Sequence, residues 1–336
     1  KTLKNLILSL IIPLAFCALP ETAGAESPVD YVDPFIGTGG VGFGVGSTYP
    51  GPQTPFGMVK PGPDTTKNGN HPGFNHCSGY WYRDTAIRGF SHTRMHGTGV
   101  PGYGNIMLMP AYGNPADMMD EASYRAPLDH DLENASPGYY SVELPDREIF
   151  VELTAGDYTA HHRYTLGRKG EKMLLVVNAA HCIGSGKPIE TDVKVDPDGR
   201  EISGWFHYDT SLGPSKGIKT YFSIRTDEEF SSFGTWADGK YAEGKKAAHG
   251  VSAGAVAGVA FPAEGVVEAV VAISFISVDQ ARRNMEADHP DRDFDSLRSR
   301  TESAWEKVLS RAPVEGGNKK LRRIYYTALY HSFQMP

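Results

Sequence analysis

The stretch that most constrains the fold lies at residues 138–277. It contains seven short runs rich in β-branched and aromatic residues: YYSVEL, YTAHHRYTL, KMLLVVNAA, EISGWFHY, KTYFSIRT, AGAVAGVAF and VVEAVVAISFIS. Turn signals separate the runs, among them Asp198-Gly199 and Asp238-Gly239. Many short strands with turn signals between them predict an all-β sandwich.

The pattern differs on both sides of this stretch. Residues 31–113 are rich in Gly and Pro, with short apolar pieces (YVDPFIG, FGMV and NIMLMP), which predicts ordered loop with short strands. After residue 277, three segments have apolar residues at helical spacing: VDQARRNMEADH, DFDSLRSRTESAWEKVLSR and NKKLRRIYYTALYHSFQM. The apolar face expected on the last helix comprises Leu321, Tyr325, Ala328, Leu329 and Phe333. We expect either that the natural chain continues and covers this face, or that the face packs on the sandwich.

The first 25 residues have the pattern of a signal peptide. Two lysines precede an apolar run at residues 6–19, and Ala23-Gly24-Ala25 forms a cleavage pattern, which predicts export. Pro13 interrupts the run, which is shorter than the roughly 20 residues of a membrane span, so a membrane anchor is disfavoured.

Three cysteines bear on export and redox state. Lipidation at Cys17 is less favoured than simple cleavage because the bulky Phe16 precedes it. Cys77 and Cys182 remain in the mature chain, where they form either one disulfide or two thiols.

Charge and glycine patterns disfavour two classes of binding protein. The formal net charge is −7, and acidic and basic residues are mixed along the chain, so the basic stripe of a nucleic-acid binder is missing. Residues 37–42 match the dinucleotide pattern G-x-G-x-x-G. However, Pro50, Pro52 and Pro55 forbid the helix that should follow, so nucleotide binding is disfavoured.

Residues 77–99, CSGYWYRDTAIRGFSHTRMHGTG, concentrate the groups that could do chemistry. His92 and His96 stand four residues apart, as in some metal sites, but the glycines around them disfavour a helix. Ser78 and Ser91 lie near histidines but outside a G-x-S-x-G elbow, which disfavours a nucleophilic serine.

Asp84 is the single carboxylate of this segment, whereas glycoside hydrolysis uses two. It is best interpreted as a surface or turn aspartate. The aromatic, Arg, His and hydroxyl side chains suit a sugar, but the same composition suits a loop packed on its own sandwich. Both interpretations remain open at this point.

Several ordered blocks resemble glycoside hydrolase family 92, the exported exo-α-mannosidases. The blocks are YVDPFIGTGG, TYPGPQTPFGMVKPGPDT, residues 77–99 and YGNIMLMP. GFSHTRMHGTG is similar to the family's GFSHTHLSGTG, and RIYYTALYHSFQMP is similar to its FYTALYHSFLAP.

After the signal peptide at 1–25, the resemblance implies an N-terminal supersandwich-like β-sandwich at 28–278. Residues 279–336 are then the helical linker and the start of the C-terminal catalytic domain, an (α/α)6 barrel. The resemblance also implies an inverting, Ca2+-dependent enzyme whose catalytic acid and base and most calcium ligands lie beyond residue 336. This chain alone is then expected to be inactive. The expected substrates are mannose-containing N-glycans or mannans, with α-1,2 linkages. The expected location is the periplasm, cell surface or surroundings of a Gram-negative bacterium.

Two alternatives come from other classes of protein. One is a non-catalytic carbohydrate-binding sandwich, and the other is a structural or partner-binding role for the helical tail.

The resemblance also implies a sugar-binding wall. GFNHCSGY matches a family block in which Phe74 stands where the family usually has a stacking tryptophan, so that either Phe74 or Trp81 supplies the flat surface. Arg94-Met95-His96 replaces the usual His-Leu-Ser. We therefore expect Phe74, Trp81, His92, Arg94 and His96 to contact substrate.

A last departure from the family lies in the glycine-rich loop. Val41, Phe43 and Val45 stand there, where some members carry histidines. Together with the other two departures, this puts the exact mannoside in doubt.

Overall fold

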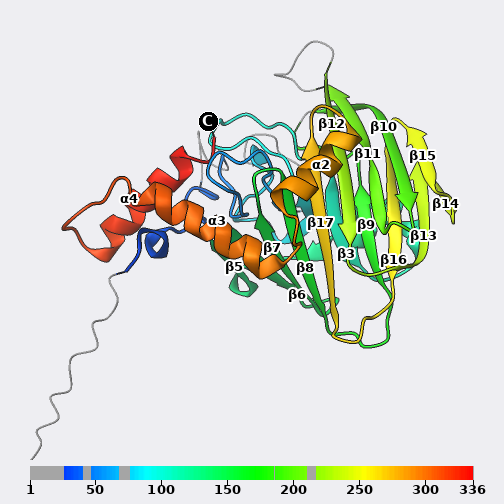
Figure 1. Ribbon diagram of the computed structural model, residues 1–336, viewed down its shortest axis with the longest axis horizontal. Coiled ribbons are helices and arrows are strands. Elements are labelled where there is room, and N and C mark those ends of the chain that lie inside the picture. The colour runs from blue at the N-terminus through cyan, green and yellow to red at the C-terminus, as the bar shows by residue number, and fades with distance from the viewer. Residues whose placement is uncertain (1–25, 41–46, 68–75, 185, 210–216, 336) are drawn as a thin grey trace, which may run out of the picture.

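The computed structural model describes residues 26–40, 47–67, 76–184, 186–209 and 217–335. The expected signal peptide, Cys17, Phe74 and the loop with Val41, Phe43 and Val45 therefore lie outside the described residues. Two antiparallel sheets form the body of the molecule, and three helices follow the last strand (Figure 1). The predicted mainly-β sandwich is confirmed.

The first sheet has eight strands in the order β1-β2-β3-β9-β16-β13-β14, with β4 paired to β2. Its strands are β1 Gly62–Thr66, β2 Ala86–Ser91, β3 Met107–Ala111, β4 Ala126–Pro127, β9 Met173–Asn178, β13 Phe230–Ala237, β14 Lys240–Glu243 and β16 Ala253–Val259.

The second sheet has nine strands in the order β15-β10-β11-β12-β17-β8-β7-β6-β5. They are β5 Glu133–Ser136, β6 Tyr139–Leu144, β7 Ile149–Ala155, β8 Thr159–Leu166, β10 Lys187–Asp196, β11 Glu201–Asp209, β12 Ile218–Thr226, β15 Ala247–Gly250 and β17 Val266–Ser274.

All seven predicted runs form strands, namely β6, β8, β9, β11, β12, β16 and β17. In the N-terminal part, NIMLMP contributes β3, whereas FGMV forms no strand. YVDPFIG also forms no strand: it starts at the last residue of the 3-10 helix η1 (Pro28–Tyr31) and continues into a turn. Short 3-10 and helical pieces fill the connections: η3 Pro115–Met119, α1 Glu121–Tyr124 and η4 His130–Leu132.

The core lies between the sheets. Every residue of β16, AGAVAGV, is buried, because small side chains let large ones from neighbouring strands pack over them. A Cβ on Gly254 would lie 2.1 Å from the Trp236 ring, so this position needs glycine.

The helices are α2 Val278–Asp288, α3 Phe294–Leu309 and α4 Lys319–Ser332. Helix α2 covers the outer face of the second sheet, where Ala281 and Met285 pack on Val270 and Ala272 of β17 (Figure 1). This explains why β17 is buried on both faces although it belongs to an antiparallel sheet.

Helix α4 packs on η1 and α3 through a stripe that overlaps the predicted one in part (Figure 1). Its buried residues are Tyr326, Thr327 and Tyr330, and Leu329 and Phe333 of the predicted face pack against the same cluster. Leu321 and Tyr325 are exposed, so the rest of the predicted apolar face points to solvent.

Cys77 and Cys182 are not joined by a disulfide, which answers the alternative left open by the sequence. Among the described residues, no helix combines the length and the apolar character needed to span a membrane.

Candidate functional site

Arg94 lies in the interior, beneath the loops of the N-terminal segment. Its guanidinium donates to the backbone oxygens of Lys60 (3.0 Å), Ser78 (2.6 Å) and Gly62 (2.7 Å). The Asp64 carboxylate lies 3.2 Å from Nη1, and this charge and the bond from His181 hold the Asp64 pKa at about 2 despite its burial. Arg94 thus joins the backbone of β1 to the loops on either side of it.

His92 belongs to a second buried network, which crosses between the sheets. Its Nδ1 lies 2.5 Å from the oxygen of Ile106, and its Nε2 lies 2.8 Å from Nε2 of His162. The Tyr164 hydroxyl lies 2.8 Å from Nδ1 of His162. Two neutral rings satisfy all three contacts. Burial lowers the pKa of His92 to about 4, and it holds the pKa of His162 well below its ordinary value.

His96 and Trp81 have buried nitrogens without a hydrogen-bond partner among the described residues. The His96 ring packs edge-on against Tyr49 (5.7 Å) and His331 (5.2 Å), and burial lowers its pKa. Trp81 is half-buried, and its backbone N–H donates to Thr65 at 2.9 Å. A sugar-binding role for these residues, as for His92 and Arg94, stays a prediction.

Asp84 is not the surface aspartate that we favoured. It is 1% exposed, accepts a hydrogen bond from Thr65 Oγ1 at 2.7 Å and pairs closely with His76. The prediction of a surface aspartate was wrong. The residues next to Asp84 in the sequence do not distinguish an exposed turn aspartate from a buried aspartate that pairs with a histidine.

An open pocket lies beside this buried layer, between the loop at residues 33–40 and the first part of the 77–99 segment. We name it the Tyr82 pocket; it has a cavity volume of about 610 Å³. Its lining residues are Asp33, Phe35, Ile36, Gly37, Thr38, Gly39, Gly40, Tyr82, Arg83 and His130. The loop approaches closely, since a Cβ on Gly39 would lie 2.9 Å from Cβ of Tyr82.

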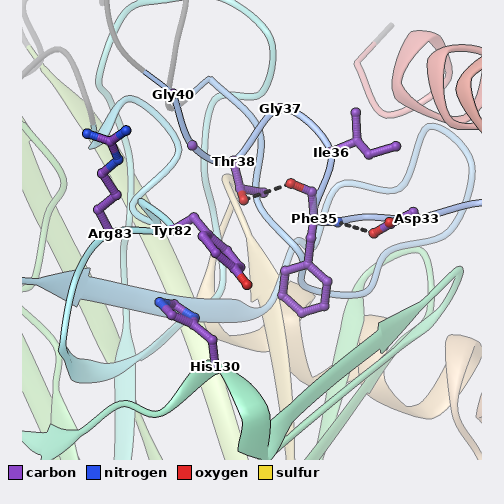
Figure 2. A pocket seen from close by; sticks show the side chains of 10 residues that line it. Asp33, Phe35, Ile36, Gly37, Thr38, Gly40, Tyr82, Arg83 and His130 are labelled. Atoms are coloured by element: carbon purple, nitrogen blue, oxygen red, sulfur yellow. Dashed lines mark hydrogen bonds between the residues drawn. The ribbon is translucent and has the colours of Figure 1, made fainter.

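Aromatic rings form one side of the Tyr82 pocket. Tyr82, which is 44% exposed, stacks on His130 with ring centroids 4.1 Å apart, and Phe35 meets the Tyr82 ring edge-on at 6.2 Å. Figure 2 shows these three rings gathered together, with the Arg83 guanidinium directed away from them on the side of Gly40. Arg83 has no ion-pair partner in the described part of the chain.

A buried carboxylate sets the charge of His130. Glu133 accepts from the hydroxyls of Tyr80 (2.6 Å) and Tyr140 (2.7 Å), and its Oε1 lies 2.5 Å from Nδ1 of His130. This hydrogen bond raises the His130 pKa. The stacked Tyr82 and His130 rings therefore form a cation–π pair when the imidazole is protonated.

The lining of the Tyr82 pocket has side chains of the kinds that suit a sugar, but it has one carboxylate where hydrolysis uses two. A flat exposed ring, a free guanidinium and an imidazole suit the apolar face and hydroxyls of a pyranose. Asp33 is the only carboxylate of the lining, whereas hydrolysis uses two. Across the described residues, no group of three or more His, Cys, Asp or Glu side chains is placed to hold a metal, so the expected Ca2+ finds no ligand set there.

Sequence reasoning missed Tyr82, Arg83 and His130. Tyr82 and Arg83 stand within the quoted 77–99 segment, directly after Trp81. His130 lies 48 positions after Tyr82 in the chain, and no local pattern marks it as a partner of that ring.

Comparisons with known proteins agree over most of the chain. The model of the glycosyl hydrolase family 92 N-terminal domain matches residues 31–274, and that of the family's catalytic domain matches residues 280–336. An uncharacterized secreted glycosidase of Arthroderma benhamiae is 25% identical over 335 residues, which cover 91% of this chain and 41% of the relative.

Two solved structures from Bacteroides thetaiotaomicron are similar. The family GH92 alpha-mannosidase BT3965 matches with a TM-score of 0.82 and 28% identity, over 93% of this chain and 41% of that one. The family GH92 inverting mannosidase BT2199 matches with a TM-score of 0.81 and 26% identity, over 92% and 40%. The chain thus spans about two fifths of the length of these relatives.

Proposed function

Because the chain belongs to glycosyl hydrolase family 92, we propose that it provides the N-terminal sandwich and first helices of an α-mannosidase, with the Tyr82 pocket as one wall of the sugar site. The observation that carries the proposal is the exposed Tyr82 ring, which stacks on His130 beside Arg83, a residue without an ion-pair partner in the described ranges. The described residues bind and orient the sugar, and the family's catalytic domain provides the hydrolytic carboxylates.

The finer features that we propose rest on the family resemblance. They are removal of terminal mannose with inversion, dependence on Ca2+, and α-1,2-linked N-glycans or mannans as substrates. The apolar run at residues 6–19 and the secreted fungal relative support export, to the periplasm or surface of a Gram-negative cell.

The test is to measure mannose binding and hydrolysis with the 336-residue chain. We expect millimolar mannose binding by calorimetry, and no turnover of aryl α-mannosides or α-1,2-mannobiose with or without Ca2+. Tyr82→Ala should weaken binding roughly fivefold, because it removes a stacking contact worth about 1 kcal/mol. The matched control is Tyr158→Ala, since Tyr158 is 45% exposed and does not line the pocket.

Three outcomes would change the proposal. Robust Ca2+-dependent turnover by this chain would contradict the placement of the catalytic groups. Micromolar mannose binding would favour the non-catalytic carbohydrate-binding alternative. Equal loss of binding in both tyrosine variants would move the sugar away from the Tyr82 pocket.

A further inference from the structure

Lys60 is a buried cation without a counter-ion among the residues that the structure describes. The residue is 6% exposed, and its ammonium donates to the thioether sulfur of Met335 at 2.9 Å. A thioether is a weak acceptor and carries no charge. Throughout the described residues, no carboxylate lies within ion-pair distance of Lys60 Nζ.

The internal segments that the structure does not describe, 41–46, 68–75, 185 and 210–216, contain no Asp or Glu in their sequence. Among the described residues, the charged group that acts on the Lys60 pKa is Arg94, which has the same sign. Burial and then this repulsion lower the Lys60 pKa to about 8.

Other buried charges of the same region are compensated. Arg94 is paired with Asp64, which also pairs with His181 at 2.8 Å, and Asp84 is paired with His76. An uncompensated buried charge is costly, whereas a paired one is tolerated. Lys60 is therefore the exception in a region where charges are otherwise balanced.

Lys60 lines an open cavity of about 310 Å³, which we name the Lys60 pocket. The lining residues are Phe56, Gly57, Met58, Lys60, Thr93, Arg94, Met95, Tyr103, Phe275 and Met335. They include two cations and no acid. Phe56 and Phe275 are 51% and 41% exposed, and Tyr103 meets Phe275 edge-on at 6.3 Å.

The backbone at two of the aromatic positions is strained. Phe56 has φ 60° and Tyr103 has φ 65°, a left-handed conformation that bulky residues rarely adopt. Such strain clusters at binding sites, where the surrounding structure maintains it. The same conformation occurs at five other non-glycine residues outside the lining of this cavity, so it accompanies the charge argument and does not replace it.

We propose that the Lys60 pocket binds an oxyanion, a phosphate or carboxylate group of a small ligand, through the Lys60 ammonium, with the rings of Tyr103 and Phe275 against the ligand's carbon skeleton. A bound anion supplies the missing counter-charge and restores the lysine pKa towards its ordinary value of 10.5. The site is separate from the Tyr82 pocket, because the two linings share no residue.

The test follows Lys60 itself by NMR, with 13Cε-labelled lysine in the 336-residue chain and inorganic phosphate as the probe. Lys60→Met identifies the resonance, and Lys240→Met, an exposed lysine on β14, is the matched control. We expect millimolar phosphate to raise the Lys60 pKa above 8 and to leave the other lysines unchanged. An unchanged Lys60 titration at 50 mM phosphate would overturn the proposal.

Thermal unfolding gives a second measurement. Phosphate should raise the melting temperature of the wild type and of Lys240→Met but not that of Lys60→Met. An equal rise in all three would show that phosphate acts elsewhere and would refute the site.

Further ligands define what the pocket recognises. Acetate compared with phosphate distinguishes carboxylate from phosphate recognition, and mannose 6-phosphate compared with phosphate measures the contribution of the aromatic rim. Inorganic phosphate alone decides whether the anion site exists. If phosphate does not bind, the mannose-binding proposal is unaffected, and if mannose does not bind, the anion-site proposal is unaffected.

Discussion

At the scale of single residues, the guanidinium of Arg94 joins β1 to the loops on either side of it. We expect Arg94→Lys to lower the free energy of unfolding by about 3 kcal/mol, because an ammonium cannot reproduce the planar fork that reaches several carbonyls and Asp64. Urea denaturation measures the loss. Arg83→Lys, on the exposed rim of the Tyr82 pocket, is the control and should unfold at the wild-type urea concentration. Unfolding of Arg94→Lys at that same concentration would show that the buried bonds contribute nothing measurable.

The same residue shows where prediction from sequence stops. Arg94 and His92 were selected because they can hydrogen-bond a sugar, yet the structure directs them to backbone carbonyls and to His162. Arg and His can hydrogen-bond a sugar hydroxyl or a group of the protein itself equally well. The residue type alone therefore does not show which of the two partners is bound. Likewise, Trp81 and Tyr82 are neighbours, and only the tertiary packing decides which ring lines the pocket.

At the scale of secondary structure, two histidines join the second sheet to the helices. Nδ1 of His161, on β8, lies 2.9 Å from Nε2 of His289, at the end of α2. Carboxylates face both rings: Glu268 on β17 lies 3.2 Å from His161, and Asp291 lies 3.1 Å from His289. Burial, followed by repulsion from His161, lowers the pKa of His289 to about 4, while Asp291 opposes the shift.

This contact predicts that acid weakens the docking of the helices. The pKa of His289 is lower in the folded chain than in the unfolded one. The neutral ring therefore contributes fully to the free energy of unfolding above pH 6.5, and this contribution is lost as the pH falls towards 4. His289→Gln keeps a donor and an acceptor but does not titrate. When the pH falls from 6.5 to 4.5, the free energy of unfolding should fall in both proteins. We expect the fall to be about 2 kcal/mol smaller in His289→Gln than in the wild type.

Hydrogen exchange over α2 and α3, with urea unfolding at each pH, measures this difference. His249→Gln, an exposed position on β15, is the control and should follow the wild type. Parallel pH profiles for His289→Gln and the wild type would exclude this histidine as the cause.

Burial explains only part of which strands were predicted. β9 and β16 are buried along almost their whole length, and their apolar runs made them evident. β10 and β13 were missed because many of their side chains are partly or fully exposed, which leaves fewer apolar residues in each run. β7 was missed although it is almost wholly buried, so its burial depends on tertiary packing. The helices were visible because their period changes after residue 277, but which stripe of α4 is buried depends on η1 and α3, far away in the sequence.

At the scale of the whole molecule, the last helix holds the loop that forms one side of the Tyr82 pocket. Tyr330 is fully buried against Trp305, with ring centroids 4.3 Å apart, and Thr327 Oγ1 accepts from the backbone N–H of Asp33 at 2.9 Å. Tyr326 stacks on Tyr31 of η1 at 5.7 Å. The two ends of the described chain are thus packed together beside the sandwich (Figure 1).

This arrangement predicts that a change in α4 reaches the Tyr82 pocket while the sandwich persists. Tyr330→Ala leaves a cavity worth about 3 kcal/mol in the cluster of η1, α3 and α4. We expect amide hydrogen exchange to accelerate at residues 28–40 and mannose binding to weaken, with β9 and β16 still protected, since local opening spares the core. Tyr325→Ala, on the exposed side of the same helix, should change neither. Unchanged protection of residues 28–40 in Tyr330→Ala would mean that the pocket loop is held by the sandwich alone, whereas loss of protection throughout β9 and β16 would mean that helices and sandwich unfold as one unit.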